Sequence, residues 1–319
     1  MKISALLIAA LASILSITAD SGTCSGPQAR VKPPPGAIVV DAMGDPKRQG
    51  SYRTIKEGVA KLDISTVKQQ TIFIFPGVYK EQVVVPLLQG ALVIQGATCD
   101  ATSYVKNQVT ISHAMAQKHL ASGVVRERNA LTSTMRFRSN NVKVYNLNIA
   151  NTAGLVGQAV AASVDGTNCS FYGCNFIGNQ DTLLTTTGRQ LYAKSRISGT
   201  VDFIFAKTVI PFTSSTTRAC TAPMPTLSTQ PSLVVRGGLF ARVVWQNSEL
   251  GRVVNPAGWS KWRNDDPTKL YFREFNNFGP GAATGHRANF SQQLNKAVDI
   301  KELFGNSYKS EWWVDPSYL

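Results

Sequence analysis

The chain has 319 residues, of which 43% are hydrophobic, and it carries a formal net charge of +14. This composition excludes a wholly disordered protein, and the length suits one large domain or two small ones. The basic balance favours an anionic partner. Because the Lys and Arg residues are scattered and form no dense basic run or binding motif, the sequence argues against nucleic acid and for an acidic polysaccharide.

Residues 1–19 have the pattern of a secretory signal peptide. Lys2 is followed by an apolar stretch at residues 3–17 and then by Thr18-Ala19. A membrane-spanning helix is the alternative, but the stretch is short and no later segment is apolar enough to span a bilayer. We therefore expect a secreted protein, extracellular or associated with a cell wall, with no membrane attachment once the signal is removed.

Five cysteines, an odd number, leave at least one without an intramolecular partner in the oxidising compartment that a signal peptide implies. Cys169 and Cys174 fall in one segment and suit packed core thiols as well as a bridge. With only three His and no C-x-x-C pair, no metal site is expected. Two N-x-S/T sequons, at Asn168 and Asn289, are compatible with a secreted glycoprotein.

Residues 20–36 are rich in Pro and Gly towards their end and predict an extended leader before a domain spanning residues 37–319. A short amphipathic helix is predicted at residues 52–62, because its apolar residues recur at helical spacing. Such a helix would cap the open end of a solenoid, which otherwise exposes an unpaired edge.

Strands separated by turn residues are predicted next, at residues 71–75, 82–86, 91–95 and 109–112, and later at 239–246. From residue 140 the sequences NNVKVYNLNIANT and NCSFYGCNFIGN align at an offset of 27 residues, which places Asn148 over Asn175. Stacked Asn side chains suit solenoid turns, since their amides satisfy one another and the backbone. The tail at residues 311–316 is expected to pack as a final turn.

Two consecutive segments share nearly one pattern, CNFIGNQDTLL at residues 174–184 and SRISGTVDFIF at residues 195–205. Each has an apolar run, a Gly, two residues and an Asp, and the offset is 21 residues throughout. This is the spacing of one coil of a parallel β-solenoid, in which equivalent residues lie on neighbouring strands about 4.8 Å apart. The alternative is an antiparallel sandwich of short strands. The Asn ladder and the constant offset favour the solenoid, which would bring Asp181 beside Asp202.

Two carboxylates about 5 Å apart repel by roughly 3 kcal/mol at an effective dielectric constant near 20, or about 2 pK units. One of Asp181 and Asp202 should then hold a proton near neutral pH while the other stays ionised. That arrangement supplies an acid together with a nucleophile or base. Either Asp alone would more often cap a turn, but two in register on adjacent coils favour catalysis.

Two glutamines accompany the pair, Gln180 directly before Asp181 and Gln158 one strand earlier. A Gln amide is an uncharged double donor that suits holding an oxyanion, although both glutamines also suit a polar ladder. Other chemistries fit poorly, because the sequence has no G-x-S-x-G elbow and no clear Ser-His-Asp arrangement. Glycoside hydrolysis also uses paired carboxylates and stays open on this reasoning.

The motifs GNQDTLL, GTVDFIF, GQAVA, YNLNIANT, PAGWSKW and FGPGAATGHRANFS closely resemble the pectin methylesterase (pectinesterase) family of carbohydrate esterases. The resemblance runs from about Gly36 to the C-terminus and is interrupted between about Ala206 and Phe240. It implies an all-β fold, a single-stranded right-handed parallel β-helix of the pectin lyase-like type. It also implies hydrolysis of the C6 methyl esters of homogalacturonan to pectate and methanol, without a cofactor.

The resemblance also implies roles for the four polar residues. Asp202 resembles the nucleophile that attacks the C6 ester carbonyl. Asp181 resembles the acid that protonates the departing methoxide and then the base that activates water against the acyl-enzyme. Gln158 and Gln180 match the positions that stabilise the tetrahedral oxyanion.

For substrate binding, Phe205 and Trp259 correspond to aromatic positions that line the sugar groove, although both also suit the core. The family's Leu-Gly-Arg-Pro-Trp motif is degraded here: residues 233–242 read LVVRGGLFAR, in which Arg236 matches the Arg and the Trp is absent. Thirteen of the twenty residues at 213–232 are Ser, Thr or Pro. We therefore regard residues 206–240 as atypical, through a lost coil or a wrong exon boundary.

A secreted, monomeric pectin methylesterase acting on methyl-esterified pectin is the leading hypothesis. The alternative is a catalytically impaired relative that binds cell-wall polygalacturonate through its positive charge, because Arg236 need not reach Asp202. A pectin lyase or polygalacturonase is a third hypothesis. The clustered acidic calcium ligands of a lyase and the Asp and His motifs of a polygalacturonase are both missing from the sequence.

Overall fold

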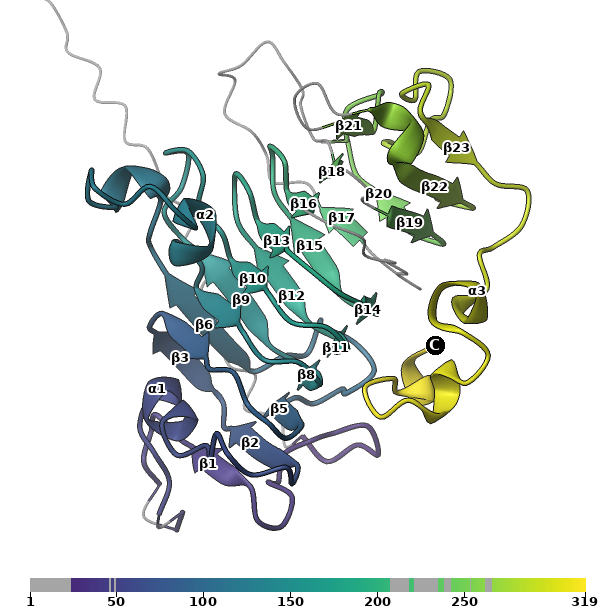
Figure 1. The fold of residues 1–319 in the computed structure, drawn as a ribbon. Coiled ribbons are helices and arrows are strands. Elements are labelled where there is room, and N and C mark those ends of the chain that lie inside the picture. Colours follow the sequence, from purple (N-terminus) through teal and green to yellow (C-terminus); the bar gives the residue numbers. More distant parts are fainter. Residues whose placement is uncertain are drawn as a thin grey trace, which may run out of the picture.

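Between residues 70 and 206, each turn of the main chain adds one strand to each of three parallel sheets, and successive turns stack into a coil (Figure 1). The computed structural model describes residues 24–45, 47–48, 50–206, 218–220, 235–237, 242–252, 254–261 and 266–319. The expected signal peptide at residues 1–19 and most of the atypical segment 206–240 lie outside the described residues.

Most of the described strands form three long sheets, which the chain visits in the order sheet 1, sheet 2, sheet 3 in every coil between residues 70 and 206. Sheet 1 contains β1 (Ile38–Val40), β2 (Gln70–Ile74), β5 (Leu92–Gly96), β8 (Val142–Tyr145), β11 (Cys169–Tyr172) and β14 (Gln190–Ala193). Sheet 2 contains β3 (Gly77–Lys80), β6 (Val109–His113), β9 (Asn148–Asn151), β12 (Asn175–Ile177), β15 (Arg196–Ser198), β17 (Arg218–Cys220) and β20 (Glu249–Leu250). Sheet 3 contains β4 (Val83–Val85), β7 (Met135–Phe137), β10 (Ala162–Val164), β13 (Leu183–Thr185), β16 (Ile204–Ala206), β18 (Val235–Gly237) and β21 (Trp259–Lys261).

A smaller sheet follows in the last part of the chain and contains β19 (Arg242–Gln246), β22 (Tyr271–Phe275) and β23 (Ser291–Gln293). The strands of the three long sheets pair in parallel, as do those of this smaller sheet. The fold is therefore the expected right-handed parallel β-helix.

The strand register reproduces both offsets in the sequence. Asn148 pairs with Asn175 at the 27-residue offset, and Leu183 pairs with Ile204 at the 21-residue offset. Because register is fixed wherever one face of a strand is buried, the interior of sheet 1 is a continuous column. Its members, in pairing order, are Ile38, Ile72, Ile94, Val144, Phe171 and Tyr192. The last two rings stack with their centroids 4.8 Å apart.

The N-terminal end of the coil is covered by helix α1 (Ile55–Val59), which contacts β1, β2 and β4. The helix is shorter than the predicted range of residues 52–62 because Thr54 caps it through a capping box with Glu57. Gly58 lies against β1, where an added Cβ would come within 2.6 Å of Val40 Cγ2. The predicted cap is therefore present, in a single closely packed turn.

Residues 24–36 of the expected leader lie against the coil. A disulfide joins Cys24 to Cys99, and Arg30 forms an isolated antiparallel bridge with Thr98. Cys169 and Cys174 are both buried free thiols, and burial raises the pKa of each to about 12. The structure therefore shows Cys169 and Cys174 as packed core thiols and not as a disulfide bridge.

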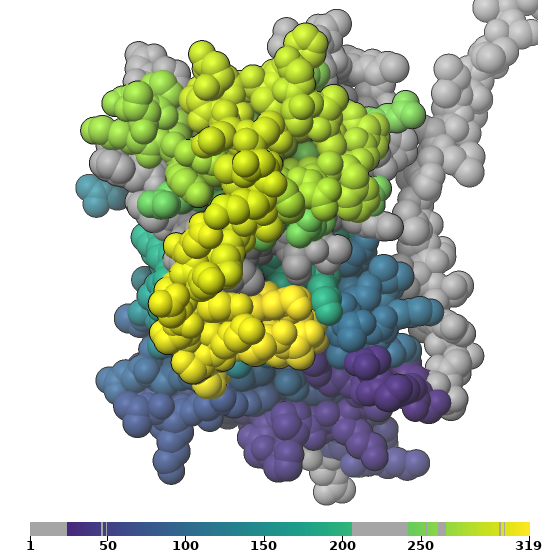
Figure 2. All heavy atoms as spheres, turned by 90° about the vertical axis from the view of Figure 1, so that its right-hand side faces the viewer, coloured from purple at the N-terminus to yellow at the C-terminus, as the bar shows by residue number. Residues whose placement is uncertain are grey.

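The C-terminal tail lies across the outer face of sheet 1 and does not add a turn to the coil (Figure 2). It contains α3 (Ile300–Phe304) and the 3₁₀ turns η3 (Tyr308–Ser310) and η4 (Pro316–Tyr318). A further 3₁₀ turn, η2 (Pro267–Lys269), lies earlier in the chain, before β22. Trp313 is buried, and its carbonyl accepts hydrogen bonds from Ser170 Oγ at 2.6 Å and Tyr172 Oη at 3.1 Å. Arg189 clamps the tail through two 2.6 Å hydrogen bonds to Glu311.

Candidate active site

Asp181 and Asp202 occupy equivalent positions where the chain turns from sheet 2 to sheet 3. Isolated parallel bridges pair Gln158 with Gln180 and Gln180 with Val201, and an aspartate follows directly after each of the last two. The backbone N–H of Asp181 donates to Val201 O at 3.0 Å. The two aspartates therefore lie on adjacent coils, at the strand spacing of about 4.8 Å.

Both aspartates are nearly buried and adopt the left-handed backbone conformation. Asp181 has φ 63° and is 5% exposed, and Asp202 has φ 45° and is 9% exposed. Asp tolerates this region better than most residues with a Cβ. The repeated conformation gives both side chains the same starting direction from the backbone.

A glycine three residues before each aspartate makes this turn fit its neighbours. A Cβ on Gly178 would lie 2.7 Å from Thr182 Oγ1, and one on Gly199 would lie 2.6 Å from the same oxygen and 2.6 Å from Phe203 Cβ. Thr182 Oγ1 in turn donates to Ser198 O at 3.0 Å. The repeated Gly in the sequence pattern is therefore explained by close packing between successive turns.

The two glutamines stack directly beside the carboxylates in the same ladder. Gln158 and Gln180 are half-buried, and Ala159 N donates to Gln180 O at 3.1 Å. Gln158 O also accepts from Gln117 N at 2.9 Å, in the 3₁₀ turn η1 (Gln117–His119). The structure thus brings all four polar residues expected at the site into one corner of the coil.

Asn129 is a further polar residue at this corner, and sequence reasoning missed it. It belongs to the short helix α2 (Arg128–Leu131), and its Nδ2 donates to Asp181 Oδ2 at 3.0 Å. The segment between β6 and β7 has no strand pattern and no repeat, so its sequence carried no signal for this contact.

The two aromatic residues expected to line the sugar groove are buried. Phe205 is 1% exposed and packs with Ala130, Val160 and Leu184 on the outer face of sheet 3. Trp259 is 2% exposed and stacks on Phe272 with ring centroids 4.6 Å apart. Its Nε1 donates to Oε1 of Glu274 in β22 at 2.6 Å. Both rings are therefore packed side chains in this structure, with Trp259 in the interior, and their expected contact with sugar remains a prediction.

Arg236 lies in β18, where its backbone pairs with Phe205 of β16 and Ser260 of β21. This register puts Arg236 on the coil that follows Asp202. Its side chain lies outside the described part of the structure, so its match to the family's Arg remains a prediction.

A cation, Arg136, lies on the outer face of sheet 3. Arg136 in β7 pairs with Asp165 at 2.6 Å and Glu127 at 3.0 Å. Burial opposes its charge, but the two carboxylates outweigh this effect and raise the pKa of Arg136. Because these two carboxylates already compensate the charge of Arg136, its ion pairs are structural.

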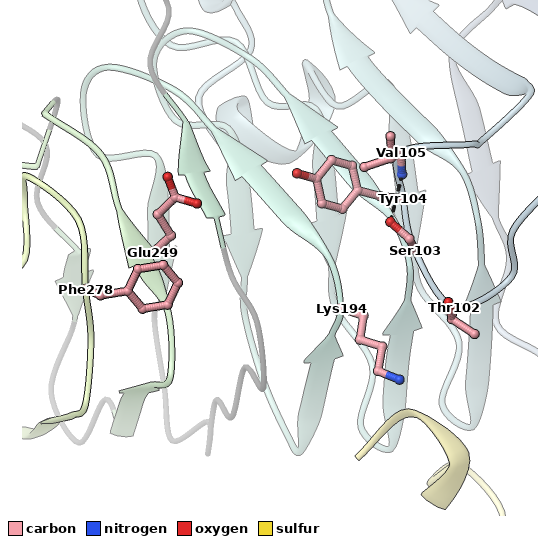
Figure 3. Close-up of a pocket in the computed structure, with 7 residues that line it drawn as sticks. All are labelled: Thr102, Ser103, Tyr104, Val105, Lys194, Glu249 and Phe278. Atoms are coloured by element: carbon pink, nitrogen blue, oxygen red, sulfur yellow. Dashed lines mark hydrogen bonds between the residues drawn. The ribbon is translucent and has the colours of Figure 1, made fainter.

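A pocket of about 380 Å³ lies elsewhere, at the corner between sheets 1 and 2 (Figure 3). It is lined by Thr102, Ser103, Tyr104, Val105, Lys194, Glu249 and Phe278. None of the aspartates or glutamines described above belongs to it. In the part of the chain that the structure describes, no group of three or more His, Cys, Asp or Glu residues is placed to hold a metal ion. Nor is any helix in that part long and apolar enough to cross a membrane.

Comparison with known proteins agrees with this fold. Residues 38–230 and 207–307 match the pectinesterase family. The chain is 36% identical to a pectinesterase of Aspergillus aculeatus and 35% identical to one of Aspergillus niger, in each case over 91% of this chain and 94% of the relative. The crystal structure of the pectin methylesterase from Aspergillus niger superposes with a TM-score of 0.72 at 28% identity, covering 91% of this chain and 100% of that one. A sequence match over most of the length, on the same coil, shows that the chain belongs to the pectinesterase family.

Proposed function

We propose that this chain hydrolyses the C6 methyl esters of homogalacturonan to pectate and methanol, with Asp202 and Asp181 as its reacting groups. Membership of the pectinesterase family makes it a carboxylic ester hydrolase. The observation that carries the residue assignment is the pairing of Gln180 with Val201, which sets the two aspartates side by side on adjacent coils.

In this mechanism the ionised carboxylate of Asp202 attacks the ester carbonyl carbon. The carbonyl oxygen becomes an oxyanion, which the side-chain amides of Gln158 and Gln180 stabilise as uncharged donors. As the tetrahedral intermediate collapses, Asp181 gives its proton to the departing methoxide, and methanol leaves an anhydride between Asp202 and the galacturonate. Asp181, now ionised, takes a proton from water, which attacks the acyl group. Pectate is then released, with Asp202 again ionised and Asp181 again protonated.

The proposal extends to partners and location. The net charge of +14 favours binding of the anionic galacturonate chain, which gains charge as esters are removed. Arg236 is proposed to orient Asp202 from the following coil, in line with its position in β18. We further propose that the chain acts as a monomer outside the cell, after residues 1–19 are removed as a signal peptide.

Methanol release from methyl-esterified pectin by the full chain tests the activity. The Asp202→Ala variant is expected to lose methanol release while still binding pectate, as measured by retention on immobilised polygalacturonate. Pectate binding without methanol release by the wild type would instead support an impaired relative. Unsaturated products or shortened chains would point to a lyase or polygalacturonase.

A further inference from the structure

Asp181 stands at the end of a chain of side-chain hydrogen bonds that begins at Arg128. Arg128 Nε donates to Gln117 Oε1 at 3.3 Å. Gln117 Nε2 donates to Asn129 Oδ1, and Asn129 Nδ2 donates to Asp181 Oδ2 at 3.0 Å. Arg128, Gln117 and Asn129 all come from the segment between β6 and β7, which folds over this corner of the coil.

The guanidinium at the start fixes the direction of every later bond. Arg has donors and no acceptor, so the atom of Gln117 that faces it must be the oxygen. The amide nitrogen of Gln117 is then left to donate, and it requires the oxygen of Asn129. Asn129 consequently presents its nitrogen to Asp181. The orientation of both side-chain amides therefore follows from the charge of Arg128.

Arg128 is itself anchored by backbone groups. Its Nη1 donates to Val124 O, and its Nη2 donates to Gln117 O at 3.1 Å. The backbone N–H of Gln117 donates to Gln158 O at 2.9 Å. The middle of the chain of bonds is therefore fixed to the strand that carries Gln158, the first of the two residues assigned to the oxyanion.

We propose that Arg128, Gln117 and Asn129 form a positioning relay that holds Asp181 through a hydrogen bond to its Oδ2. This inference rests on the proposed function and assigns three positioning residues to it. Because the relay donates to the carboxylate, it favours the ionised form of Asp181, the form that activates water in the second step.

Other charged groups around Asp181 are accounted for as follows. Asp202 lies on the next coil and opposes ionisation of Asp181. Lys118 and His119 of η1 are exposed, and His119 Nδ1 accepts from Ala116 N at 3.1 Å. Glu127 at the start of α2 turns to Arg136, as described above, and Arg236 of β18 has no described side chain. Arg128 is linked to Asp181 through the side chains of Gln117 and Asn129.

Two near-isosteric variants test the relay in opposite ways. Asn129→Leu removes the donor to Asp181 and keeps most of the volume. Gln117→Glu replaces the donor amide by a second acceptor, so that Asn129 Nδ2 turns towards residue 117 and its oxygen faces Asp181. Both changes penalise the ionised form of Asp181. The alkaline limb of kcat/KM for methanol release, which requires protonated Asp181, is expected to move up by on the order of one pH unit in both variants.

Asn151→Ala is the matched control. Asn151 is a buried amide whose Nδ2 donates to the same segment, to Met115 O, Thr132 O and Val160 O at 2.8, 3.0 and 2.9 Å. It is expected to lower the Tm and leave the alkaline limb at its wild-type pH. Loss of stability alone therefore does not reproduce the relay's signature.

A second readout does not depend on turnover. Carbon-13 NMR of the aspartate carboxyl carbons, with the Asp181 resonance identified by its loss in Asp181→Asn, reports the titration of this group directly. A midpoint raised in Asn129→Leu and Gln117→Glu, and unchanged in Asn151→Ala, supports the relay. Unchanged midpoints in the first two variants overturn it. If the two variants show these raised midpoints but the wild-type protein releases no methanol, the relay is kept and the proposed function is rejected.

Discussion

The turn before Asp202 offers a sharp test of how packing positions the site, through the substitution Gly199→Ala. The added Cβ would lie 2.6 Å from Thr182 Oγ1, 2.6 Å from Phe203 Cβ and 3.0 Å from Asn179 O. The first two contacts are 0.8 Å inside the 3.4 Å at which ordinary contact begins. None of the three atoms is the end of a long flexible side chain, so the turn itself must shift.

Overpacking of this kind costs about 1–3 kcal/mol, which lowers the Tm by about 2–4 °C per kcal/mol in a chain of this size. Because Asp202 follows three residues later, a shift of several tenths of an ångström is expected to lower kcat for methanol release by about 10- to 100-fold. Thermal unfolding and steady-state methanol release measure the two effects. Gly26→Ala is the control, since nothing lies within 4 Å of its added Cβ, and both quantities should stay at wild-type values. Wild-type kcat and Tm in Gly199→Ala would refute the reasoning.

Three further predictions concern the rest of the chain. Burial opposes the charge of Glu311, but hydrogen bonds from Arg189 and the indole of Trp313 outweigh this effect and hold the pKa of Glu311 below its usual value. The contact therefore stabilises the fold at pH values above the ordinary Glu pKa of about 4.3. This stabilisation is lost as the pH falls through the lowered pKa. The Tm difference between wild type and Arg189→Ala should therefore be largest near neutral pH and vanish in acid, and a constant difference would contradict it. Trp313→Ala, at a side chain 2% exposed, should cost about 3–5 kcal/mol in urea unfolding, and a cost under about 1 kcal/mol would show that the tail is not docked. In protein secreted by a glycosylating host, glycopeptide mass spectrometry should find a glycan at exposed Asn289 and none at Asn168, whose amide bonds within the ladder; a glycan at Asn168 would contradict this.

The repeat made the coil and its register predictable. A 21-residue offset with the same apolar and Gly positions allows one stacking, and the structure pairs Leu183 with Ile204 and Gln180 with Val201 accordingly. The Asn148–Asn175 pairing followed from the 27-residue offset for the same reason. Periodic pattern determines register because a slip of one residue would turn a buried face towards solvent.

Contacts made by non-repeating segments were not predictable in this way. Asn129 comes from an irregular segment that reaches Asp181 across 52 residues of sequence, and no spacing rule connects the two. The tail residue Trp313 packs against Tyr172 from 141 residues away. The aromatic character of Phe205 and Trp259 is visible in the sequence, but their burial depends on the residues that the fold brings around them.

The central claim is that the carboxyl groups of Asp181 and Asp202 act as one unit. Methanol release by Asp181→Asn, Asp202→Asn and the double variant tests it most directly, because the effects of groups that work together are far from additive. We expect each single variant to lose at least about 10³-fold in kcat/KM and the double variant to lose little more. Losses that multiply in the double variant, or a single variant that keeps more than about a tenth of wild-type activity, would contradict the claim.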